Sequence, residues 1–294
     1  KNEAANGVLA FWMETLTLYL LDGTRIAEQI EHSLSKFNTD TLPLVTPLLV
    51  RLLSMPKPEH SFLGHTVARC VAADAVDDRL LWRYIAGDIS QDCIIKFHLG
   101  NKLHCGLEEF GDKNGSFLKQ RMVQSTVLLD LALEAIEQWS QIQSSRYGET
   151  RIGYRSGYLR NTSYNDAHTQ TDDPCIDSER ILLNAVEAAI LNHATKHSDW
   201  WQKNRKRLCF NHEGALCYFA VLAVTNSPEP NLDLIGRLLC DTNLLEFELS
   251  FELCTLIQSA YIYLDDATQD AVMTAIQATW EGSETDDGTR FWIL

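Results

Sequence analysis

The sequence is poor in positive charge. It holds 25 lysines and arginines against 40 aspartates and glutamates, which gives a formal net charge of -15. Nucleic acids and anionic membranes attract basic surfaces, so this imbalance argues against binding either of them through the surface as a whole. A local basic site remains compatible with the same composition.

Long apolar runs and catalytic motifs are also missing. No apolar run reaches the roughly 18 residues that a membrane helix needs, so we expect no membrane contact. The chain has no Gly-rich phosphate loop, no serine elbow and no Cys–His nucleophile signature. These absences favour a chain without catalytic activity or a cofactor of its own.

Prolines are few, and helical periodicity fills the space between them. There are seven prolines, most at places where helices should end. Apolar residues recur at helical spacing, as in Ile26, Ile30, Leu34 and Phe37. We expect helices over residues 9–21, 26–37, 44–54, 65–86, 117–143, 177–197, 212–225, 232–240, 244–264 and 271–280. No segment shows sustained alternation of polar and apolar residues, so the predicted fold class is all-α.

Antiparallel pairs of such helices are the units of α-solenoids of the HEAT or tetratricopeptide kind. The sequence shows no clean repeat period, so a compact helical bundle is the alternative. We expect a helical array over residues 1–145, a polar connecting segment over 146–176 and a second array over 177–294. One continuous solenoid is compatible with the same pattern.

The eight cysteines indicate reduced thiols. Cys70, Cys217 and Cys254 lie inside apolar helical runs, where free cysteines are often buried. The expected compartment is therefore the cytoplasm.

The polar stretch from Arg146 to Asp173 interleaves arginines with tyrosines, and only Glu149 opposes them before Asp166. Arginine and tyrosine often dominate the binding energy of protein interfaces. The alternative is a surface loop whose tyrosines pack on neighbouring helices. The predicted partner-binding residues are Arg146, Arg151, Tyr154, Arg155, Tyr158, Arg160 and Tyr164.

A possible zinc set follows. His193 and His197 share a helix face, and Cys209 and His212 come shortly after. Neither half matches a standard zinc-finger spacing, so chance co-occurrence is the favoured interpretation and we expect no metal.

The basic run Lys203–Arg207 lies beside Trp200 and Trp201. Such a run could contact a phosphate backbone or stack on bases. It also fits a solvated helix end, where cations complement the helix dipole. A nucleic-acid contact is therefore kept only as an alternative function.

Paired aspartates supply the enzyme alternative. Asp265 and Asp266 resemble the magnesium-binding motif of isoprenoid-diphosphate enzymes, and Asp74, Asp77 and Asp78 form a second acidic set. Two such clusters would have to face each other to clamp a diphosphate through magnesium. The first pair fits equally well as a helix break and N-cap, with Asp266 or Thr268 starting the next helix.

Two stretches carry a family resemblance: GYLRNTSYNDAHTQTDD (Gly157–Asp173) and LCFNHEGALCYFAVLAVTNSP (Leu208–Pro228). They resemble the helical C-terminal region of large bacterial STAND-type NTPases of antiphage defence. The resemblance implies a sensor array that grips a viral protein. This chain has no GxxxxGK[ST] P-loop, so it implies that any NTPase activity lies elsewhere in the polypeptide.

The ends suggest a piece of a longer polypeptide. The chain opens on Lys1 rather than methionine and closes on the apolar run Phe291–Leu294, which we expect to pack against something. The prediction is thus a non-catalytic, cytoplasmic protein-recognition module. Its expected partners are a protein ligand and the remainder of its own polypeptide.

Overall fold

The computed structural model describes a subset of the chain, and every regular element within it is a helix. The described residues are 7–12, 14–15, 32–33, 47–48, 77–79, 81–82, 116–146, 174–245 and 249–282. No strand occurs among them, so the all-α prediction is confirmed. Four helices are expected before residue 90, and most of their residues lie outside the described ones. Residues 147–173 of the polar connecting segment also lie outside them.

The chain forms two compact units. Unit 1 comprises Lys1–Ala135 and Thr162–Val186, and unit 2 comprises Ile136–Asn161 and Glu187–Leu294. Two long helices, α9 (Thr126–Arg146) and α10 (Pro174–Thr195), each contribute residues to both units. The predicted division into two arrays with a connecting segment stays a prediction.

One helix expected from the sequence is divided in the structure. The single helix predicted over residues 117–143 is two helices, α8 (Ser116–Gln124) and α9. Ser125 separates them, because its hydroxyl accepts a hydrogen bond from the Leu128 backbone N–H at 3.1 Å and caps α9. Val127 lies in the first turn of α9 and is 42% exposed, whereas Ala132 is buried.

Most of unit 2 is described. After the end of α10 it contains α11 (Asp199–Cys209), α12 (Gly214–Asn226), the 3-10 helix η1 (Glu229–Asn231), α13 (Leu232–Leu239), α14 (Thr242–Leu245), α15 (Ser250–Ala260), the 3-10 helix η2 (Tyr261–Tyr263) and α16 (Asp266–Gly282). The run predicted as one helix over residues 244–264 is thus divided between α14, α15 and η2.

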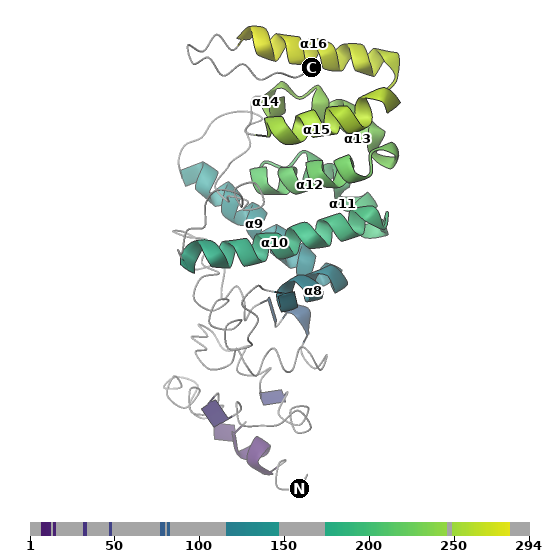
Figure 1. Cartoon of the computed structure of the whole chain (residues 1–294). Helices are drawn as coiled ribbons and strands as arrows, with labels where there is room; N and C mark the ends of the chain where they lie inside the picture. Colours follow the sequence, from purple (N-terminus) through teal and green to yellow (C-terminus); the bar gives the residue numbers. More distant parts are fainter. Residues whose placement is uncertain are drawn as a thin grey trace. The chain divides into compact units, whose positions relative to one another are not determined.

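These helices form two stacked hairpins. α11 packs on α12, α13 packs on α15, and α12 and α15 pack against each other. α16 then packs on α13 and α14, and in Figure 1 α12, α15 and α16 lie one above another. Each hairpin therefore contacts its neighbour in the stack.

The sequence of α12 explains why this helix is covered by its neighbours in the stack. α12 (GALCYFAVLAVTN) is apolar on all sides, and Leu216, Phe219 and Val221 are completely buried. A helix without a polar face has to be covered on several sides, and α12 is covered by α11 and α15. Among the described residues, no helix is both long and apolar enough to cross a bilayer.

Candidate functional site

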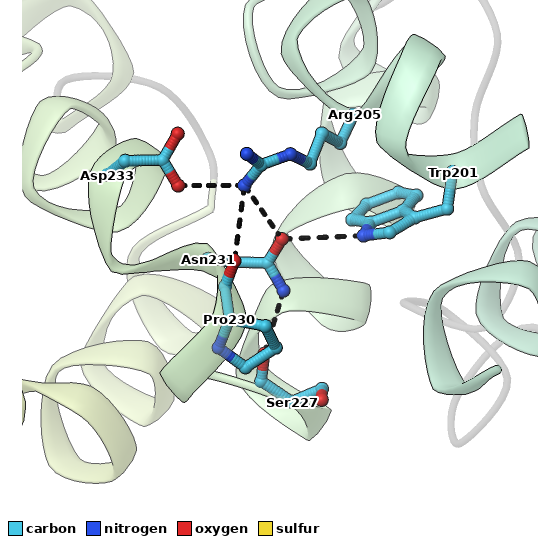
Figure 2. Close-up of polar contacts among 6 residues, drawn as sticks. All are labelled: Trp201, Arg205, Ser227, Pro230, Asn231 and Asp233. Atoms are coloured by element: carbon cyan, nitrogen blue, oxygen red, sulfur yellow. Dashed lines mark hydrogen bonds and ion pairs between the residues drawn. The ribbon is translucent and has the colours of Figure 1, made fainter. Parts of the chain in front are cut away.

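A polar junction joins the two hairpins (Figure 2). Arg205 of α11 donates to the Asp233 carboxylate of α13 at 2.7 Å and to the Asn231 side-chain oxygen at 3.3 Å. That oxygen also accepts from the Trp201 indole N–H at 3.4 Å, and the Asn231 amide donates to the Ser227 carbonyl at 2.8 Å. Asn231 is fully buried and its amide has partners on both sides, so the junction fixes α13 against α11.

The basic run Lys203–Arg207 is largely used within the fold. Arg205 belongs to the junction, and Arg207 forms a two-pronged ion pair with Glu137, its Nε donating at 2.9 Å. Trp200 and Trp201 are buried, so the two indole rings have little surface on which a base could stack. Lys203 and Lys206 are exposed cations of the run. This arrangement fits a helix end with internal ion pairs better than a nucleic-acid surface.

The four residues of the possible zinc set have different surroundings. His193 packs its ring on Trp200 with centroids 4.9 Å apart, and its Nδ1 lies 2.9 Å from the Ser198 hydroxyl. His197 is exposed in the left-handed region at φ 48°.

Cys209 is completely buried, and its carbonyl accepts from the Cys217 thiol. His212 is exposed. Within the described part of the chain, no three histidine, cysteine, aspartate or glutamate side chains gather in a way that could hold a metal ion.

One of the paired aspartates, Asp265, caps a helix. The Asp265 carboxylate accepts from the Thr268 backbone N–H at 2.7 Å, at the start of α16. This bond and one from the Thr268 hydroxyl lower the pKa of Asp265. In unit 1, Asp78 is paired with Arg121 at 2.8 Å, and Asp74 lies outside the described residues. The expected helix break lies here: α16 begins at Asp266, one of the two predicted starting residues, and Asp265 supplies the N-cap.

The polar stretch from Arg146 to Asp173, here called the Arg/Tyr-rich segment, has no described side chains. Arg146 is the last residue of α9, but its side chain is not described. Arg151, Tyr154, Arg155, Tyr158, Arg160 and Tyr164 are all outside the described residues.

Unit 2 contains a groove that was not predicted from the sequence. It runs between α13 on one side and η2 and the start of α16 on the other, with a volume of about 570 Å³. Ligand pockets span about 300–1,000 Å³, so the groove is large enough to take a side chain or a short peptide segment. Its lining residues are Leu232, Asp233, Gly236, Arg237, Cys240, Tyr263, Leu264, Asp265, Ala267, Thr268 and Ala271.

Close helix approach forms the groove. A Cβ atom added to Gly236 of α13 would lie only 2.6 Å from the Thr268 methyl group of α16, so the two helices touch there. Ala267 and Ala271 of α16 line the groove at a spacing of one helical turn and are too small to fill it. The missing side-chain volume at these positions leaves the space open.

Apolar and charged groups surround the groove. Tyr263 on its edge is 47% exposed, and the neighbouring Ile262 is 74% exposed. Arg237 places its guanidinium 4.5 Å from the centre of the Phe210 ring, and Asp233 keeps 60% of its side-chain surface exposed beside Arg205. The groove therefore combines an apolar interior with a charged rim.

Comparisons with family models, curated proteins and solved structures gave no match. Burial raises the pKa of the Cys240 thiol, which keeps it protonated and weakly nucleophilic at neutral pH. Asp265 is committed to capping α16 and Asp233 to the Arg205 ion pair. Both carboxylates are therefore engaged in contacts within unit 2.

Proposed function

We propose that this chain is a non-catalytic protein-recognition module of a larger cytoplasmic protein. The groove between α13 and α16 carries the proposal, because it offers an open apolar interior between two helices that pack on each other. Its neighbour Ile262, an aliphatic side chain with 74% of its surface in water, favours a protein partner.

The packing of unit 2 supports this role. Its hairpins are locked together by Arg205, Asp233 and the buried Asn231, so a partner would meet a preformed surface. The proposed extension of these hairpins into a solenoid would add area to that surface, over which modest contacts sum.

We further propose that the larger protein is an antiphage defence NTPase of the STAND type, and that a viral protein is the ligand. The support is the resemblance of Gly157–Asp173 and Leu208–Pro228 to the sensor arrays of that family. Leu208–Pro228 comprises the end of α11 and the whole of α12, the most buried helix of unit 2. A framework role for this stretch would leave ligand contacts to the surface around it.

The Arg/Tyr-rich segment is proposed as a second contact. Arg155, Tyr158 and Arg160 have the side-chain chemistry of interface anchors. The diphosphate-enzyme and nucleic-acid alternatives have less support, since Asp265 caps α16 and Arg205 and Arg207 are paired internally.

Affinity capture tests the proposal. The tagged chain is expressed in bacteria with and without phage infection, and bound protein is identified and quantified by mass spectrometry. The proposal predicts one viral protein at a stoichiometric ratio, absent from uninfected cells. Turnover of an allylic diphosphate that requires magnesium and is lost in Asp265→Asn would contradict a non-catalytic role.

A further inference from the structure

We infer that the groove between α13 and α16 binds a basic peptide segment of the partner, with an aliphatic side chain inserted between flanking lysines or arginines. This inference rests on the proposed recognition function and adds the chemistry of the bound segment.

The interior of the groove selects an apolar side chain. Leu232, Leu264, Ala267 and Ala271 contribute aliphatic surface to it, and the contact between Gly236 and Thr268 closes its floor. An inserted aliphatic side chain would remove this surface from water, which is the main source of affinity at such sites.

Charge near the start of α16 selects the flanking residues. Asp265, Asp266 and Asp270 are all exposed, and α16 contains no lysine or arginine. The lowered pKa of Asp265 keeps its carboxylate ionised at neutral pH. On the α13 side of the groove, Arg205 is paired with Asp233 and partly offsets its negative charge. Arg237 is the cation on the α13 side, where it lies over Phe210.

The helix terminus does not favour an anion. Helix N-termini attract anions through free backbone N–H groups, but here the Asp265 carboxylate accepts from the Thr268 N–H. An anionic ligand would meet this carboxylate and its two acidic neighbours. The half-exposed ring of Tyr263 provides instead an aromatic face that a lysine or arginine can approach.

Fluorescence anisotropy with synthetic peptides tests the inference on the full chain. The probe is a labelled pentapeptide with a central leucine between two lysines on each side. One control peptide has glycine in place of leucine, and the other has glutamates in place of the lysines. We expect saturable binding of the first peptide, about tenfold or more tighter than the glycine peptide, and no binding of the acidic one.

Two tryptophan variants locate the binding. Ala271→Trp fills the groove and should weaken leucine-peptide binding about tenfold or more. Met273→Trp adds the same ring at an exposed position of α16 outside the groove lining and should leave binding unchanged. Both proteins are first compared with the parent by circular dichroism and thermal melting.

The inference would be overturned by no saturable binding of the leucine peptide, by equal affinity for the glycine or the acidic peptide, or by equal loss in both tryptophan variants when both are folded. A folded Ala271→Trp chain that still captures the viral protein in full would also contradict it, while the recognition function would stand. Failure of capture by the parent chain would instead count against the proposed function.

Discussion

Gly236 of α13 lies so close to Thr268 of α16 that a Cβ atom at position 236 would come within 2.6 Å of the Thr268 methyl carbon. The contact holds the two helices together at the floor of the groove. A side chain added at position 236 would force Thr268 or one of the two helices to move.

Gly236→Ala should therefore destabilise the protein. Overpacking costs about 1–3 kcal/mol, and the better helix propensity of alanine returns about 0.5–1 kcal/mol of it. Urea denaturation followed by circular dichroism measures the difference. In a Thr268→Ser background the clashing methyl is gone while the hydroxyl is kept, so there Gly236→Ala should be neutral or stabilising. The same loss in both backgrounds would show that the contact is not the cause.

The buried Asn231 amide should be needed for stability. Asn231→Ala leaves the Trp201 indole N–H and the Ser227 carbonyl without this partner in the interior. We expect a loss of about 1–3 kcal/mol in the free energy of unfolding. Asn226→Ala, at an exposed position at the end of α12, is the matched control and should change little. Equal effects of the two substitutions would refute the role given to the junction.

Much of this architecture could be predicted from sequence, because it depends on local pattern. The helix expected over residues 212–225 is α12 (Gly214–Asn226), and α16 begins at Asp266, one of the two starting residues that the sequence suggested. The break at Ser125 was missed, because a serine within a long apolar periodicity is compatible with either a helix interior or a cap.

The groove and the internal use of the basic run depend on contacts distant in sequence. Arg205 could be recognised as an ion-pair residue only once Asp233 was placed beside it by the turn through η1. The groove requires α13 and α16 to meet at Gly236. The available sequence signal for this contact was the glycine in LDLIGRLLC, because alanine at that position would favour the helix more.

Glu252 should make stability depend on pH. Only 7% of Glu252 is exposed, and its Oε2 atom accepts no hydrogen bond from any described residue. Burial raises its pKa above that of the unfolded chain, so the folded state binds the proton more tightly. Stability contributed by the protonated form is present at acidic pH and is lost as pH rises through the raised pKa.

Glu252→Gln should accordingly be more stable than the parent at neutral pH, and this advantage should shrink toward about pH 4. Urea denaturation midpoints across this range measure it, with the exposed Glu229→Gln as control. An advantage that stays constant with pH would show that ionisation of Glu252 is not responsible.

The thiols should report the state of the groove. Cys240 lines the groove and is partly exposed, whereas Cys209 and Cys217 are completely buried. Alkylation with iodoacetamide, followed by peptide mass spectrometry, should modify Cys240 well before the two buried thiols. Ala271→Trp should slow the reaction at Cys240 and leave that at Cys254 unchanged. Equal rates at Cys240 in parent and variant would argue that the groove is not open in solution.

The Arg/Tyr-rich segment should contribute to binding and not to folding. Replacing Arg155, Tyr158 and Arg160 together with alanine should lower the amount of captured viral protein by about tenfold or more. The far-ultraviolet circular dichroism and the melting temperature should stay those of the parent. A lower melting temperature with loss of helical signal would assign these side chains to the fold instead.

The most direct test of the central claim is parallel capture from phage-infected bacteria by three tagged chains: the parent, Ala271→Trp and Met273→Trp. The account predicts the same viral protein at a stoichiometric ratio on the parent and on Met273→Trp, and a loss of most of it on Ala271→Trp, with all three chains equally folded. Absence of any stoichiometric protein on the parent would contradict the recognition function. Equal capture by all three chains would show that the partner binds elsewhere than in the groove between α13 and α16.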